Sequence, residues 1–183
     1  GVLAVGLTPS TPLQILDHWG EGFWALHTFA MQMCWILLGG YIVAVSPPVE
    51  TALRRLARLP RSSRQAVALT AALSMTLAFL NWGLGLVASA FFTRALARER
   101  PKLNYTLVVA CAYLGMAATW HAGLSASAPL MVATPGNFLE KELVGVIPTS
   151  QTIFHPFNLG LVALTAGILV WVAASLHCDK REI

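Results

Sequence analysis

Charged residues are scarce in this chain. They make up 11% of its 183 residues, whereas an ordinary soluble domain carries about a quarter. Apolar residues, at 56%, stand in their place and form separate helix-length runs rather than alternating ten-residue segments. This composition excludes a soluble globular domain and a membrane β-barrel. The sequence predicts an all-α polytopic membrane protein, with 1–183 forming a single transmembrane domain.

Cysteine and acidic residues are also rare where chemistry would need them. Cys34, Cys111 and Cys178 lie far apart without CxxC spacing, so neither a disulfide framework nor a metal site is supported. The apolar runs contain no Asp or Glu, which argues against a carboxylate proton relay inside the membrane. The net charge of +4 comes from basic residues beside these runs, a pattern typical of membrane topology. We expect the lipid bilayer as a partner, and neither nucleic acid nor a cofactor.

The clearest apolar runs predict membrane-spanning helices at 22–45 and 152–177. Before the first of them, two tryptophans together with Asp17, His18 and Glu21 indicate a short interfacial helix at 12–24. After it, five arginines in 50–64 predict a short amphipathic basic helix. These arginines are the strongest positive-inside signal of the chain, and a contact with anionic lipid is compatible with them.

The run at about 66–97 has basic residues at both ends, which a single crossing would place on opposite sides of the membrane. A re-entrant helical hairpin resolves this conflict. It would turn at Asn81-Trp82-Gly83-Leu84-Gly85, since Asn and Gly favour chain reversal. Each arm of roughly 14 residues is about 21 Å long, which passes the centre of a core about 30 Å thick without crossing it. The alternative is one long helix with a glycine kink.

The distribution of charge favours the hairpin. With it, 11 of the 12 Lys and Arg residues lie on the cytoplasmic side and only Lys141 lies outside. Without it, the second and third basic clusters exchange sides and the bias largely disappears. We therefore expect an inner-membrane protein whose C-terminus is cytoplasmic.

The run at about 104–137 begins as an apolar helix and breaks after Ala118. From Trp120 to Asn137 it contains two glycines, two prolines and several hydroxyl side chains, which lipid-facing backbone does not tolerate. Broken helices turn amide ends and free carbonyls toward ligands, so this stretch and the hairpin tip predict a binding site. The predicted substrate- or ion-binding residues are Asn81, Gly83, Gly85, Ser125, Ser127, Thr134, Gly136 and Asn137. His121 is a further candidate, as a proton carrier.

Several motifs carry a family resemblance across almost the whole chain. They are DHWGEGFWAL at 17–26, MQM at 31–33, NWGLGLV at 81–87, ACAYLG at 110–115 and SASAPLMVATPGN at 125–137. With them the chain resembles the AtoE-type short-chain fatty acid transporters of the ion transporter superfamily. One departure is Trp120-His121-Ala122-Gly123, where the family has a glycine-rich run.

The resemblance implies an inner-membrane carrier of small monocarboxylates such as butyrate or acetoacetate, coupled to H⁺ or Na⁺. The family architecture implies two inverted repeats, each with a re-entrant hairpin and a broken helix, and an elevator-type carrier that is often a homodimer. This chain matches the first repeat only. We therefore expect 1–183 to be truncated at both ends and to need a second transporter repeat as a partner.

Two other readings remain open. The chain could be a half-carrier that does not transport alone. It could also be an intramembrane serine hydrolase with Ser125 as nucleophile and His155 as base, which requires the two side chains within hydrogen-bonding reach. The predicted topology places Ser125 inside the membrane and His155 at its outer edge, so we expect a transporter and not an enzyme.

Overall fold

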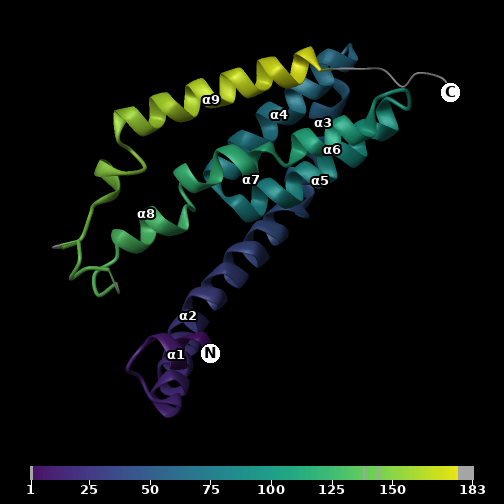
Figure 1. Cartoon of the computed structure of the whole chain (residues 1–183). Coiled ribbons are helices and arrows are strands. Elements are labelled where there is room, and N and C mark those ends of the chain that lie inside the picture. Colours follow the sequence, from purple (N-terminus) through teal and green to yellow (C-terminus); the bar gives the residue numbers. More distant parts are fainter. Residues whose placement is uncertain (1, 138, 144, 177–183) are drawn as a thin grey trace. The chain divides into compact units, whose positions relative to one another are not determined.

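A computed structural model describes residues 2–137, 139–143 and 145–176 of the chain, and its course is shown in Figure 1. All regular structure in these residues is helical, which confirms the predicted all-α class. The elements are α1 (Val2–Leu7), α2 (Pro12–Ala44), α3 (Pro47–Arg58), α4 (Ser63–Leu80), α5 (Trp82–Glu99), α6 (Tyr105–Ala112), α7 (Leu114–Ala118), η1 (Trp120–Ala122), α8 (Ser127–Val132), η2 (Thr149–Gln151) and α9 (Pro156–Ser175).

The chain divides into two compact units, Gly1–Trp35 and Ile36–Ile183. In the first unit, α2 begins at a capping box, in which the Thr11 amide donates to Gln14 Oε1 at 2.8 Å and the Gln14 amide donates to Thr11 Oγ1 at 3.3 Å. The prediction of a separate interfacial helix at 12–24 was wrong, because α2 is continuous. No proline follows Pro12 until Pro47, and a helix accommodates Gly20 at a cost of about 1 kcal/mol.

The core of the second unit lies where α4, α5 and α6 pack together. Phe92, Leu96 and Val108 are fully buried there. Helix α9 packs against α4, and α3 packs against α5. Helix α9 therefore packs against the same core that contains the α4–α5 pair.

Four helices among the described residues are long and apolar enough to cross a membrane, which supports a multi-pass membrane protein. They are Pro12–Ala44, Ser63–Leu80, Tyr105–Val132 and Pro156–Ser175, the third being the broken segment from α6 to α8. Helix α5 is not among them. Its last turns carry Arg94, Arg98 and Glu99.

The far ends of α4 and α5 lie close to each other. Arg58, at the end of α3, donates from Nε to Glu99 Oε1 at 3.1 Å. Arg100, just after α5, donates to the carbonyl oxygen of Pro60, just before α4. The chain therefore leaves this basic end along α4, reverses, and returns to it along α5.

Candidate functional site

The reversal between α4 and α5 occupies a single residue, Asn81. Its backbone N–H donates to Leu77 O at 2.8 Å, which closes α4. Its side-chain Oδ1 accepts from the backbone N–H of Leu84 at 2.9 Å, which caps α5. One extended residue (φ −156°, ψ 122°) thus ends one helix and begins the next. The turn is narrower than the predicted 81–85, and each arm has 18 residues instead of about 14.

The glycines after this turn allow close approach of neighbouring backbone. A Cβ at Gly83 would lie 2.8 Å from Ile36 O of α2, and a Cβ at Gly85 would lie 2.6 Å from Ala78 Cα of α4. Real Cβ atoms essentially never come within 3.0 Å of another heavy atom. Both predicted site glycines are therefore required by the packing of the tip itself.

The segment opposite the tip is a helix broken several times, at Tyr113, at Thr119 and from Gly123 to Ala126. Side chains satisfy the backbone groups that these breaks release. Ser74 of α4 donates to Ala112 O at 2.5 Å and accepts from the Gly115 amide at 3.0 Å. Thr119 donates from Oγ1 to Met75 O at 2.9 Å. Polar backbone in an apolar core is thus paired across two helices.

The tip and the break meet at Ser125. Its buried Oγ accepts from the Trp82 amide at 2.9 Å, and the neighbouring Leu124 amide donates to Phe79 O at 2.7 Å. Gly123 lies directly against Phe79, so that a Cβ there would be 2.7 Å from Phe79 Cα. The structure therefore brings two predicted site residues, Asn81 and Ser125, to the same junction.

The remaining predicted residues of the break lie farther along the chain. Ser127 is half-buried at the first position of α8. Thr134 donates to Leu130 O, Asn137 donates to Thr134 O, and the Gly136 amide donates to Glu140 Oε2. With φ at +77°, Gly136 takes the left-handed conformation that favours glycine. The described contacts of Thr134, Gly136 and Asn137 thus build a local turn. The part of the break that contacts the α4–α5 tip is Gly123 to Ser125.

His121 lines an open pocket of about 520 Å³ between the break and α9. Its side chain is exposed and stands edge-on to Trp120. Other polar residues of the pocket are Thr152, Asn158 and Thr165. The Asn158 side chain donates from Nδ2 to Ala122 O at 3.1 Å and to Ile153 O at 2.9 Å, which ties the start of α9 to η1.

A family model described as short chain fatty acid transporter matches residues 1–183. The chain belongs to this family. The match covers the α4–α5 tip and the broken helix together, so the junction described above lies entirely within the family region.

Two curated relatives support this membership, and both carry the name "Putative short-chain fatty acid transporter". The relative from Escherichia coli K12 is 43% identical over 182 residues, which are 100% of this chain and 41% of that protein. The relative from Haemophilus influenzae is 38% identical over 164 residues, which are 86% of this chain and 36% of that protein. The chain thus spans about two fifths of these relatives. No solved structure matches it.

The family and both relatives are named as transporters and not as enzymes, which argues against the serine hydrolase. The local contacts agree with this. Ser125 Oγ is engaged by the Trp82 amide, and His155 Nδ1 accepts from the Phe157 amide at 3.2 Å, where it caps α9. Among the residues that the structure describes, no group of three or more His, Cys, Asp or Glu side chains could hold a metal ion.

Two residues of the site escaped the sequence analysis. Trp82 was assigned only to the turn, yet its indole Nε1–H is buried and has no hydrogen-bond partner within the described part of the chain. Asn158 was not singled out, although an amide side chain two residues after Pro156 in an apolar span is itself a signal. The position of the Trp82 indole depends on tertiary packing and could not be read from the chain.

Proposed function

We propose that the protein is an ion-coupled secondary transporter of short-chain fatty acids, and that residues 1–183 form the first of its two inverted repeats. The observation that carries the proposal is the junction of tip and break, at which the Trp82 amide donates to Ser125 Oγ. A helix pair ending on an unwound helix is the arrangement that transporters use for ligand sites near the membrane midplane. The names of the two relatives supply the substrate class.

The junction offers donors suited to a carboxylate. The Ser125 hydroxyl accepts from Trp82 and keeps its own proton to donate, since a hydroxyl has one donor and two acceptor positions. The unpaired indole N–H of Trp82 lies at the same tip. In this proposal Ser127, Thr134, Gly136 and Asn137 complete the wall on the side of α8. The coupling ion, H⁺ or Na⁺, offsets the charge of the carboxylate, because none of the proposed site residues is Lys or Arg.

Re-entrance of the α4–α5 pair is part of the proposal. Each arm has 18 residues, or about 27 Å of helix, and the hydrocarbon core is about 30 Å thick. The bonds from Arg58 to Glu99 and from Arg100 to Pro60 hold both basic ends at one level. With that level at the cytoplasmic face of the inner membrane, the tip stops inside the bilayer and the C-terminus is cytoplasmic.

The test is uptake of radiolabelled butyrate, under imposed Na⁺ or proton gradients, into proteoliposomes that contain residues 1–183 together with the second repeat. We expect uptake that follows one of these gradients and falls at least tenfold in Ser125→Ala, which keeps the size of the site but removes the hydroxyl. The matched control is Ser175→Ala near the end of α9, where the hydroxyl donates to Trp171 O of the same helix, and it should leave uptake unchanged. Uptake that ignores both gradients would contradict ion coupling, and full activity of Ser125→Ala would contradict the site.

The second repeat and a homodimer are the proposed partners. Residues 1–183 reconstituted alone should fail to take up butyrate, and adding a second repeat should restore uptake. Robust uptake by residues 1–183 alone would refute the half-carrier. Cross-linking or mass measurement of the reconstituted protein tests for the dimer.

A further inference from the structure

A second pocket lies away from the tip, between α3 and the last turns of α5. We call it the arginine pocket. It is lined by Glu50, Leu53 and Arg54 of α3 and by Phe91, Arg94 and Arg98 of α5. Its volume is about 180 Å³, and a single water needs only about 10–15 Å³. The pocket therefore has room for a group much larger than water.

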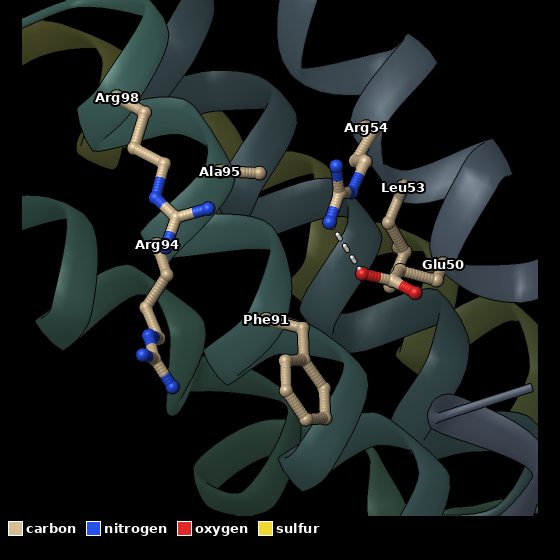
Figure 2. Close-up of a pocket in the computed structure, with 7 residues that line it drawn as sticks. All are labelled: Glu50, Leu53, Arg54, Phe91, Arg94, Ala95 and Arg98. Atoms are coloured by element: carbon tan, nitrogen blue, oxygen red, sulfur yellow. Dashed lines mark hydrogen bonds and ion pairs between the residues drawn. The ribbon is translucent and has the colours of Figure 1, made fainter.

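The charges of the arginine pocket are unbalanced. Glu50 Oε1 is paired with Arg54 Nη2 at 2.7 Å, one helical turn away. The side chains of Arg94 and Arg98 have no hydrogen-bond or ion-pair partner within the described residues. Figure 2 shows these two arginines on one side of the pocket and the Glu50–Arg54 pair on the other. Three guanidinium groups thus face one carboxylate, and the pocket attracts an anion.

The shape of the anion follows from the guanidinium group. Guanidinium presents a planar fork of N–H donors, which matches the oxygens of a phosphate or carboxylate in pairs. Arg94 and Arg98 are four residues apart on α5 and therefore lie on one face of the helix. With Arg54 also lining the pocket, three guanidinium groups supply donors for the several oxygens of one phosphate.

The position of the pocket identifies the source of that phosphate. Leu53 is buried on the apolar face of α3, and the Phe91 ring forms an apolar wall below the charges. Arg98 lies beside Glu99, at the basic end where Arg58 joins α3 to α5 and Arg100 joins the end of α5 to Pro60 before α4. A polar rim of arginines above an apolar wall fits a molecule that has both a phosphate and hydrocarbon. Basic pockets between membrane helices bind anionic lipid head groups in this way.

We propose that the arginine pocket binds the phosphate of an anionic phospholipid. The site is separate from the junction at Ser125 and does not depend on which substrate the protein transports. The bound lipid bridges α3 and α5 and offsets one of the two positive charges that Glu50 leaves unbalanced.

Native mass spectrometry of the detergent-purified protein at about 150 mM ionic strength tests the proposal. The probes are dioleoylphosphatidylglycerol, dioleoylphosphatidylcholine and inorganic phosphate. Salt at this concentration screens charges beyond about 8 Å, so distant basic residues contribute little. We expect phosphatidylglycerol to bind with 1:1 stoichiometry, phosphatidylcholine to bind at least tenfold more weakly, and millimolar phosphate not to displace the bound lipid.

Variants locate the site. The double variant Arg94→Gln/Arg98→Gln should weaken phosphatidylglycerol binding about 25-fold, at about fivefold for each arginine near a lipid surface. The matched control Arg61→Gln/Arg64→Gln removes the same charge outside the pocket and should change binding less than twofold. Glu50→Gln should tighten binding by about fivefold, because it frees Arg54. This gain cannot arise from misfolding.

The outcomes are distinguishable. An equal loss of affinity in both double variants, or a loss in Glu50→Gln, would overturn the site, because only general charge attraction would then remain. Equal binding of phosphatidylcholine would overturn the need for an anion. Binding of free phosphate to the pocket without binding of phosphatidylglycerol would overturn the lipid assignment. Butyrate uptake is measured in parallel, and its result does not bear on any of these lipid-binding outcomes.

Discussion

Gly123 holds the break against α4, and replacing it with alanine tests that contact directly. A Cβ at this position would lie 2.7 Å from Phe79 Cα and 2.8 Å from its carbonyl carbon. Both atoms belong to the main chain and cannot rotate away. Contacts of real Cβ atoms stop at 3.0 Å, so the break must move from α4 by a few tenths of an ångström or more. The backbone angles of Gly123, φ −101° and ψ −170°, are open to alanine, so the clash alone determines the effect.

We expect Gly123→Ala to lower the free energy of unfolding by about 1–3 kcal/mol, the usual cost of overpacking a close-packed interior. For a chain of this size the melting temperature should fall by about 2 to 12 °C. Thermal unfolding in detergent, followed by tryptophan fluorescence, measures the shift. Uptake of butyrate should fall as well, because the same movement separates Ser125 Oγ from the Trp82 amide.

The matched control is Gly160→Ala in α9, where a Cβ meets nothing within 4 Å. The same chemical change there should stabilise the helix by about 0.5–1 kcal/mol. If Gly123→Ala melts at the same temperature as Gly160→Ala, the close contact between the break and Phe79 does not exist in the protein.

Three further changes test other parts of the fold. Asn81→Ala and Asn104→Ala each remove an N-cap side chain and should each lower the free energy of unfolding by about 1 kcal/mol. Butyrate uptake should fall only in Asn81→Ala. Equal uptake in the two variants would show that the tip has no role in transport. Ser74→Ala leaves a buried backbone amide and carbonyl without their partner and should lower the free energy of unfolding by about 1–3 kcal/mol; a melting temperature equal to that of the parent protein would contradict this pairing. Phe92→Ala in the core should lower the free energy of unfolding by about 3–5 kcal/mol. Phe157 is 72% exposed, so Phe157→Ala should leave the packing between the helices almost unchanged. Chemical denaturation in detergent measures both effects.

Local signals in the sequence explain much of the helical framework. Pro47 and Pro156 stand in the first turn of α3 and α9, and Asn81 and Asn104 cap α5 and α6. These residues act through their own backbone and nearest neighbours. The pattern could therefore be read from the chain alone, including the break of the helix after Ala118.

The contacts between elements could not be read in this way. Gly39 and Gly40 are adjacent residues of the same type. A Cβ at Gly39 would meet nothing within 4 Å, whereas a Cβ at Gly40 would lie 2.9 Å from Gly83 Cα. Likewise Ser125 reaches the tip while Ser127 begins α8. Which of two like residues makes the contact depends on helix rotation and depth, and these are set by the packing of distant segments.

The crossing of Gly40 and Gly83 has a mechanical consequence. At this point the end of α2 approaches α5 through main-chain atoms, and no hydrogen bond joins residues 36–44 to 81–87, all of which the structure describes. The break, by contrast, is fastened to α4 by Ser74 and Thr119 and to the tip by Ser125. Close packing therefore holds α2 at this point, without the hydrogen bonds that hold the break, and a side chain larger than hydrogen at Gly40 or Gly83 would push the two helices apart.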